Sequence, residues 1–415
     1  MKYCLAVDVA KDKSCLGFFA VKDLTKGKDG LICLVPPEDC HHVREELDRF
    51  LRKISPYPKE EIAVVMESTG IYHLPLRNFF TGHDYNVIVI NPLVSNRSMT
   101  SLRKTKTDKA DVFKIALCYF KGECNAQYNA SEDYEEIRQL SRNIERRKDE
   151  LAMKKMVLRN KLLLSAPAYE KIFLKDRLFT PAVLNLISLC PHADDILVRR
   201  RDVMVNAMAE KGHSVFKERY EGQVISLKEK SRSLLVGVRR TPAVIGEIRR
   251  LAAEIESLEN EIRSELSEAL PKARSLPLFA VLTSFCGIGS ETAFHLTAEF
   301  GDFARFHRVS SVTAYAGLDP STYESGRTLD AKGSITKRGN PHLRKWLYCT
   351  VSSIIMHEKD SEREFTDYYH QKRGQKNRSG QTHHHFYAMT ACCNKLIHKI
   401  YYRYKDAISN NAVQA

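Results

Sequence analysis

The sequence contains no apolar stretch long enough to cross a bilayer, and no signal peptide opens it. Its longest apolar stretches, such as residues 62–66 and 347–356, are far shorter than the ~20 residues that a transmembrane helix needs. The first residues run straight into an apolar strand pattern. We therefore expect a cytoplasmic protein that has no membrane as a partner.

The sequence also lacks CxxC pairs, internal repeats and low-complexity tracts. Its 11 cysteines are scattered and, without an export signal, are expected to be reduced. With 415 residues, of which 43% are hydrophobic and 28% charged, the chain is long enough for two or three ordinary domains. Its composition is that of a soluble, globular protein.

Acidic residues are too few to balance the basic ones. The 65 Lys and Arg against 51 Asp and Glu give a formal net charge of +14, and the pI is near 9.2. A surplus of this size indicates a polyanionic partner, because each Lys or Arg on a phosphate releases condensed counterions. An anionic membrane surface is the weaker alternative, since the sequence contains no basic amphipathic helix of the interfacial kind.

Residues 1–125 alternate strand and helix patterns. Apolar runs predict strands at 3–9, 14–21, 30–35, 62–66 and 86–90. Helical spacing of apolar residues predicts helices at 38–54, 72–80 and 108–120. This order describes an α/β domain, in which helices cover a mixed sheet.

Residues 126–272 are predicted to form a helical coiled-coil region. A long charged helix spans 131–165, and the clearest periodic pattern lies at 243–268, where apolar residues alternate steps of four and three: Val244, Ile248, Leu251, Ile255, Leu258 and Ile262. We expect Pro271 to end this second helix. The two helices can pair with each other or with a second subunit, and the sequence does not decide between these. Residues 166–240 are irregular to helical, and 273–415 form a mostly helical last domain.

Four acidic residues follow or begin elements of the α/β domain. Asp8 lies near the end of the first strand, Glu67 follows the fourth, and Asp108 and Asp111 are three apart on one predicted helix. Carboxylates this close repel each other and require cations, for which Mg²⁺ is the natural choice. Two such ions about 4 Å apart would clamp the attacking and leaving oxygens of a phosphodiester. Any one of these acids alone is better explained as a solvated strand-end or helix-cap residue, but the set of four favours a metal site.

The segment 317–345 is basic and rich in glycine and small hydroxyl residues. From residue 327 onward it carries six basic side chains against one acid, Asp330: Arg327, Lys332, Lys337, Arg338, Arg344 and Lys345. A serine beside a glycine among such cations is suited to attack on a phosphate. Composition does not choose Ser325 over its neighbours, and a solvated or phosphate-binding loop without catalysis is the alternative.

Two further places are candidates for contacts with nucleic acid. Gly287 and Gly289 separate two predicted helices, and backbone N–H groups of such a turn can hold a DNA phosphate. An ordinary helix–helix turn is nearly as good an explanation. Arg103, Lys104 and Lys106 precede the predicted acidic helix and are candidate phosphate contacts.

Several ordered motifs carry a resemblance to a known family. They are AVDVAK (6–11), ESTGIYHLPL (67–76), VINP (89–92), KTDKAD (106–111), CGIGSETAFHLTAEFGDFARF (286–306), AYAGLDPSTYESG (314–326) and ITKRGNPHLRKWLY (335–348). In these motifs the sequence resembles the DEDD-type insertion-sequence transposases, the "one-ten" family of bridge-RNA-guided recombinases. The resemblance covers nearly the whole chain, except for 165–240, which match nothing in the family.

The resemblance implies a RuvC-like, that is RNase H-like, first domain, and a last domain with a helix-hairpin-helix-like element. It implies that Asp8, Glu67, Asp108 and Asp111 bind Mg²⁺, with Mn²⁺ as a substitute, and that Ser325 forms a phosphoserine link to a DNA 5′ end. It further implies donor and target DNA as partners, a structured guide RNA, a homodimer that assembles into a tetramer with composite sites, and a place at the bacterial nucleoid.

Two other functions remain as alternatives. A junction-resolving RuvC-like nuclease that hydrolyses with water would need the acidic tetrad but not Ser325. A non-catalytic nucleic-acid-binding scaffold would need neither. The three consecutive histidines at 383–385 depart from the family, and we interpret them as phosphate contacts or a solvated patch within a helix.

Overall fold

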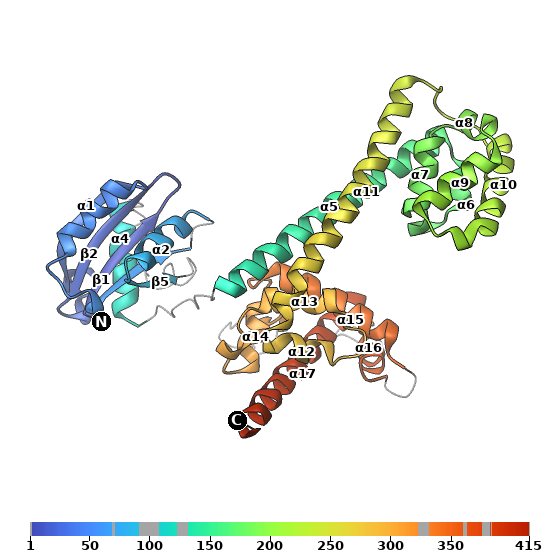
Figure 1. Cartoon of the computed structure of the whole chain (residues 1–415). Helices are drawn as coiled ribbons and strands as arrows, with labels where there is room; N and C mark the ends of the chain where they lie inside the picture. Colours follow the sequence, from blue (N-terminus) through green and yellow to red (C-terminus); the bar gives the residue numbers. More distant parts are fainter. Residues whose placement is uncertain are drawn as a thin grey trace. The chain divides into compact units, whose positions relative to one another are not determined.

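The computed structural model describes residues 2–68, 71–90, 108–122, 132–322, 332–359, 363–375, 382 and 384–414. The chain forms two compact units, 1–129 and 130–415 (Figure 1). Of the predicted domain boundaries, the one at residue 272 lies inside this second unit and stays a prediction. No helix in the described ranges combines the length and the apolar character needed to cross a membrane.

The first unit is built on a five-stranded mixed sheet. Its strands are β1 (Tyr3–Val9), β2 (Lys13–Val21), β3 (Leu31–His41), β4 (Ile62–Glu67) and β5 (Asn86–Ile90). They lie in the order β3-β2-β1-β4-β5, with β1, β4 and β5 parallel and the β1–β2–β3 connections antiparallel. The central strands are buried on both faces, which explains why they read as continuous apolar runs.

Helices cover both faces of this sheet. On one face α1 (Arg44–Ile54) and α2 (His73–Gly82) pack Phe50 and Phe80 against strand residues such as Leu5. On the other face α4 (Asp108–Phe120) packs Val112 against the small side chains of the central strands. Short 3₁₀ turns at Leu24–Gly30 and Lys59–Glu61 connect the elements.

One prediction for this unit was wrong. The helix expected to start at residue 38 starts at Arg44, because β3 continues through Glu38 to His41 along β2. The extension contains Pro36 and Pro37, which cannot donate to a ladder. An edge strand tolerates them, because one of its sides has no neighbouring strand, and the register shifts at this point.

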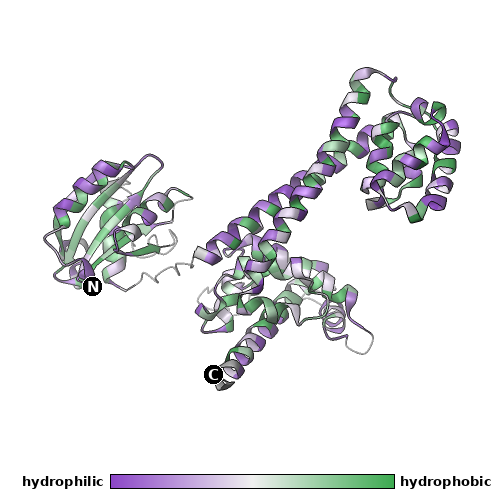
Figure 2. Ribbon diagram, in the orientation of Figure 1, coloured by the Kyte–Doolittle hydropathy of each residue, from purple (hydrophilic) through white to green (hydrophobic). Residues whose placement is uncertain are grey.

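The second unit is organised around two long antiparallel helices, α5 (Glu132–Ser165) and α11 (Pro242–Arg274). Hydrophilic and hydrophobic residues alternate along both helices (Figure 2). The structure answers the question of pairing, since the two helices pack on each other within one chain. Pro271 does not end α11, which runs one turn further to Arg274. Ala269 and Ala273 are fully buried around that turn, and this packing outweighs the lost hydrogen bond.

Residues 166–240, for which the sequence predicted no defined elements, form a helical lobe at one end of this helix pair. It contains α6 (Ala168–Ile172), α7 (Pro181–Leu189), α8 (Ala193–Val198), α9 (Arg201–Lys211) and α10 (Lys217–Ser233). The 3₁₀ turns Lys175–Phe179 and Ser214–Phe216 complete it. Its apolar core includes Leu158 of α5 and Ile248 of α11, so the lobe is anchored on the helix pair.

The remaining elements pack around the other end of the pair. They are α12 (Pro277–Thr283), α13 (Ser290–Phe300), the 3₁₀ turn Phe303–Arg305, α14 (Val309–Ala316), β6 (Pro320–Thr322), β7 (Lys332–Ile335), α15 (Pro341–His357), α16 (Glu364–Gly374) and α17 (His385–Gln414). Their core includes Ile137 and Ile144 of α5. Cys392 and Cys393 are buried in it.

Candidate functional site

Asp8 and Glu67 lie at the same end of two neighbouring parallel strands. The ladder between β1 and β4 runs in register up to the residues just before these two acids. Because side chains alternate along a strand, Asp8 is on the face of Ala6, and Glu67 is on the face of Val65. That face is the one that α4 covers, and both acids are half-buried there.

Helix α4 begins at the end of the sheet where these acids lie. Cys118, near the end of the helix, interacts with Cys4 at the start of β1. Val112, earlier in the helix, lies close to Gly17, where an added Cβ would be 2.8 Å from the Val112 Cγ1. Gly17 pairs with Ala6, which is nearer than Cys4 to the carboxyl end of β1. The helix therefore runs from the carboxyl end of β1 back toward its start. Its first turn carries Asp111, which is half-buried.

The predicted metal ligands are only partly described. Asp108 is the first residue of α4, and its side chain lies outside the described part of the chain, while Asp111 forms an ion pair with Lys114. Among the side chains that are described, no three His, Cys, Asp or Glu are grouped so as to hold a metal ion. The donors at this end of the sheet are carboxylate oxygens, the type that Mg²⁺ prefers. For Asp111 to bind a cation, it would have to exchange Lys114 for that cation.

The segment predicted to carry the nucleophile connects two short strands. Strands β6 and β7 pair antiparallel, with Pro320 opposite Ile335 and Thr322 opposite Lys332. Ser325 lies in the chain between them, outside the described residues. The same applies to Arg327, to Arg103, Lys104 and Lys106, and to the side chain of Lys332, so these predictions are not tested.

The basic residues that follow β7 have two different environments. Lys337 and Arg338 are exposed, and Lys337 adopts a left-handed conformation with φ of 54°. Arg344 is turned inward, where its Nη1 donates to the carbonyls of Ala316 and Gly339 at 2.9 and 3.3 Å. Burial lowers the pKa of Arg344 from its usual value. Lys337 and Arg338 are thus open to a ligand, whereas Arg344 braces the backbone around them.

The glycine turn between α12 and α13 forms where the sequence predicted a turn between helices. Gly287 has φ of 80°, and a Cβ there would lie 2.9 Å from the Cα of Ile354, so only glycine fits. Its carbonyl accepts a hydrogen bond from Ser353 Oγ at 2.8 Å. Gly289 faces open space just before α13. Gly287 therefore packs the turn onto α15, and Gly289 is the residue that a ligand can approach.

Of the described histidines in this run, His384 precedes α17 and His385 is the first residue of that helix. The His385 ring contacts the hydroxyls of Tyr348 and Tyr369 at 3.0 and 2.7 Å. His384 is exposed, and His383 lies outside the described residues. For His385 the interpretation as a phosphate contact or solvated patch was wrong, since its ring is held between two tyrosines.

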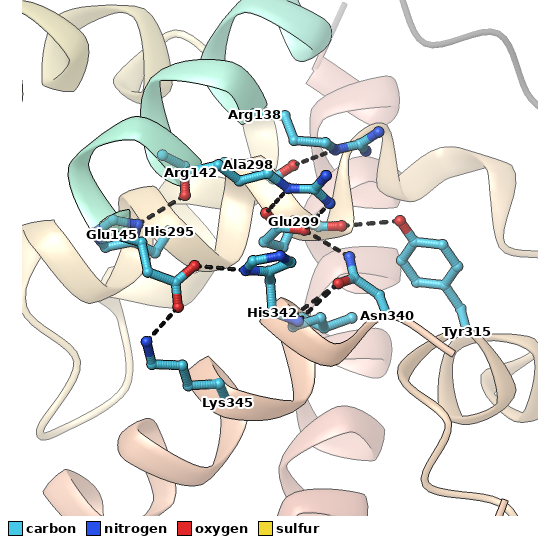
Figure 3. A network of polar contacts seen from close by, with 12 residues as sticks. Arg138, Arg142, Glu145, His295, Ala298, Glu299, Tyr315, Asn340, His342 and Lys345 are labelled. Carbon is cyan, nitrogen blue, oxygen red and sulfur yellow. Dashed lines mark hydrogen bonds and ion pairs between the residues drawn. The ribbon is translucent and has the colours of Figure 1, made fainter. Parts of the chain in front are cut away.

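A polar network that sequence reasoning missed joins α5, α13 and the start of α15 (Figure 3). At its centre is Glu299, which is fully buried and paired with Arg142 and Asn340. One signal was present in the sequence, since Glu299 is an acid that stands between the apolar residues Ala298 and Phe300. Its partners are 157 and 41 residues away along the chain, so periodicity could not find them.

Next to this network lie two further polar groups. Glu145 of α5 accepts from His342 and Lys345 at 2.6 Å each, beside a cavity of about 310 Å³. Burial raises the pKa of Glu145, but the hydrogen bonds from Lys345 and His342 outweigh burial and leave the pKa below its usual value. His295 is fully buried, with Ser141 Oγ 2.8 Å from its Nδ1. This end of α5 therefore contacts the last part of the chain through charges as well as through apolar packing.

Comparisons with known proteins point to one family. A sequence model of the transposase IS116/IS110/IS902 family matches residues 280–370, and a model of the IS110 DEDD transposases matches residues 34–167. The first match runs from within α12 to within α16 and contains the glycine turn, β6, β7 and α15. The second contains Glu67, α4 and the whole of α5.

Individual relatives agree with these matches. A pilin gene-inverting protein of Moraxella bovis is 22% identical over 293 residues, which are 70% of this chain and 67% of the relative. The transposase for insertion sequence element IS1111A of Coxiella burnetii is 31% identical over 26% of this chain and 27% of its own length. An IS110 insertion element protein of Streptomyces coelicolor is 26% identical over 32% of this chain and 31% of its own. The chain belongs to the IS110 family of DEDD transposases and is a DNA transposase or recombinase.

Proposed function

We propose that this protein cuts and rejoins the DNA of an insertion sequence in a Mg²⁺-dependent reaction that passes through a covalent phosphoserine at Ser325. In this proposal the first unit is an RNase H-like, RuvC-like nuclease domain. The observation that carries it is the placement of Asp8 and Glu67 on one face, at the ends of adjacent parallel strands. The first turn of α4, with Asp108 and Asp111, lies over that face.

The four carboxylates would hold the divalent cation, which supplies a positive charge for the scissile phosphate. Lys114, which forms an ion pair with Asp111 in this structure, would give up that carboxylate to the cation. The half-buried positions of Asp8 and Glu67 limit the water around the carboxylates, which strengthens their attraction for a cation.

Ser325 would act as the nucleophile. Its Oγ forms a bond to phosphorus while the bond from phosphorus to the 3′ oxygen breaks, and the serine proton passes to the departing 3′ oxygen. The DNA 5′ end stays on the serine until a 3′ hydroxyl of the partner strand reverses the step. Lys337 and Arg338 are exposed close to β7 and can hold flanking phosphates.

The partners of the reaction follow from the family. Donor and target DNA would be selected by a structured bridge RNA, and the subunits would assemble as dimers into a tetramer, with the acids of one subunit beside the serine of another. The formal charge of +14 supports binding to nucleic acid. The name of the Moraxella relative describes inversion of a gene, which also requires cutting and rejoining of DNA. Such a protein would act at the nucleoid.

A covalent adduct assay tests this proposal. A supercoiled plasmid carrying the DNA that flanks this gene is incubated with the protein, RNA transcribed from the same flank and MgCl₂. We expect a protein–DNA adduct that is absent from Ser325→Ala and from Asp8→Ala. Ser321→Ala, which removes a hydroxyl four residues away, is the matched control and should form the adduct. Nicking that persists in Ser325→Ala without an adduct would instead support a nuclease that uses water.

A further inference from the structure

Glu299 is a fully buried carboxylate whose hydrogen bonds are all made by elements distant in the sequence (Figure 3). Arg142 of α5 donates to it twice, from Nε to Oε1 at 2.9 Å and from Nη2 to Oε2 at 3.1 Å. Asn340 Nδ2 donates to Oε2 at 2.6 Å. The side-chain hydrogen bonds to Glu299 raise the pKa of Arg142 from its usual value, so the guanidinium remains charged. Glu299 thus ties α5 and the start of α15 to α13.

Asn340 uses its other side-chain atom to begin α15. Its Oδ1 accepts from the backbone N–H groups of His342 and Leu343 at 3.0 and 3.2 Å, which makes it the N-cap. Its own N–H donates to the carbonyl of Tyr315 at 2.7 Å. The side-chain carbonyl of Asn340 is therefore held by the start of α15, and its NH₂ group is held by the carboxylate of Glu299.

The same residues fix both ends of the segment that carries Ser325. Tyr315, whose hydroxyl donates to the carbonyl of Glu299 at 3.1 Å, lies in the last turn of α14, shortly before β6. Asn340 follows β7 by a few residues. Between them the backbone of Lys337 donates to Gly317, and a Cβ on Gly339 would come within 2.3 Å of the Gly317 nitrogen. The two ends of the segment are thus held in direct contact with each other and with α13.

Stability alone does not account for a charge in this place. Removing a carboxylate from water is costly, and apolar residues of similar volume often make a buried site as stable as an ion pair does. A carboxylate that accepts hydrogen bonds from both Arg142 and Asn340 instead fixes the direction of each donor. Displacements of about 1 Å can lower the rate of a reaction about 100-fold, so such a fixed direction matters near a nucleophile.

We propose that Glu299 is a positioning residue for the recombination reaction: through Asn340 and Arg142 it sets the place of the β6–β7 segment, and so of Ser325, relative to the α5–α11 helix pair. This rests on the proposed function, in which Ser325 is the nucleophile. Glu299 contacts neither DNA nor the reacting atoms. Its effect is on the rate of adduct formation and not on the affinity for DNA.

A charge-conserving pair of substitutions tests this. In Asn340→Asp the new carboxylate faces the carboxylate of Glu299. In Glu299→Gln the new NH₂ group faces the N–H donors of Arg142 and Asn340. The double variant Glu299→Gln/Asn340→Asp restores a hydrogen bond of opposite direction, while the new carboxylate still caps α15 and the net charge is unchanged. We expect each single variant to form the adduct about 100-fold more slowly at saturating plasmid, and the double variant to recover to within about 10-fold of wild type.

Controls separate this proposal from its alternatives. Glu247→Gln breaks the partly exposed Lys161–Glu247 ion pair at the other end of the α5–α11 helix pair and should form the adduct at the wild-type rate. Amide hydrogen exchange at residues 316–319 and 336–340 should accelerate in the single variants and slow again in the double variant. The plasmid concentration giving half-maximal rate should stay the same throughout.

The outcomes distinguish two failures. If the wild type forms no adduct, or Ser325→Ala still forms it, the proposed function fails, while the exchange experiment still tests whether Glu299 fixes the segment. If the adduct depends on Ser325 but Asn340→Asp forms it at the wild-type rate, the positioning role of Glu299 is refuted. A double variant that is as slow as the single ones, or variants that change only the half-maximal plasmid concentration, would refute it as well.

Discussion

Protonation of His295 should destabilise the second unit as the pH falls below neutrality. The ring is fully buried, and its Nε2 has no hydrogen-bond partner among the described residues. Burial lowers the pKa of His295 to about 3, and the positive charges of Lys148 and Lys345 act in the same direction. The folded chain therefore keeps this histidine neutral at pH values where an exposed histidine is charged.

The expected magnitude follows from the two pKa values. Above pH ~6.5 the ring is neutral in both states, so its contribution to stability is fully present. Below that pH the unfolded chain binds a proton that the folded chain does not, and the free energy of unfolding falls by up to ~1.4 kcal/mol per pH unit. At pH 5 the loss from this one group is about 2 kcal/mol. The loss continues until the pH approaches the folded-state pKa of about 3.

Tryptophan fluorescence can follow this loss at the site itself. The chain has a single tryptophan, and its ring stacks on His295 with centroids 3.8 Å apart and an interplanar angle of 9°. Denaturant unfolding is measured between pH 7.5 and 5 for the wild type and for His295→Gln. We expect the wild type to lose about 2 kcal/mol more than the variant over this interval. Equal losses in the two proteins would show that His295 is not the group that takes up the proton.

Three further predictions concern the turn, the metal and the nucleic acid. Gly287→Ala should lower the free energy of unfolding by about 1–3 kcal/mol in the same fluorescence assay, because it forces a side chain into a left-handed, closely packed position. Gly289→Ala, which meets open space, should change it by less than about 0.5 kcal/mol. MgCl₂ should raise the melting temperature of the wild type but not of Asp8→Asn, and equal shifts would remove Asp8 from the metal site. DNA binding measured against salt should weaken steeply, with a slope about one unit smaller in Lys337→Ala or Arg338→Ala, and an unchanged slope would exclude those contacts.

The strands of the first unit could be predicted because their apolar runs are continuous and bounded. β1, β4 and β5 are buried on both faces, and the predictions for them were confirmed to within a residue. The failure at β3 has a physical origin, since residues 38–41 pair with β2 although Pro36 and Pro37 stand in the strand. A proline lowers strand propensity everywhere, and only the edge position, which the sequence does not reveal, makes it tolerable.

The placement of Asp8 and Glu67 followed from the same strand patterns. Both lie where a buried run ends, and parallel pairing of β1 with β4 brings those ends to one level. The Glu299 network could not be predicted in this way. The sequence patterns around its partners, Arg142 and Asn340, predict the local structure without any contact to Glu299. Only the packing of α5 on α13 brings these residues together.

Charge explains why the two long helices find each other and not a copy of themselves. Along the seam α5 contributes mostly cations and α11 contributes glutamates, in the pairs Arg147–Glu261, Lys154–Glu254, Lys155–Glu259 and Lys161–Glu247. As one helix runs forward the other runs back, so every pair is satisfied only in the antiparallel register. Partly exposed ion pairs of this kind add at most about 1 kcal/mol each to stability. Two copies of α11 packed through this seam would instead set glutamates against glutamates, which costs several kcal/mol. The spacing of apolar residues predicts that each helix packs on another helix. The distribution of charge selects α5 and α11 as the two partners. The second subunit of the proposed assembly would therefore bind through another surface.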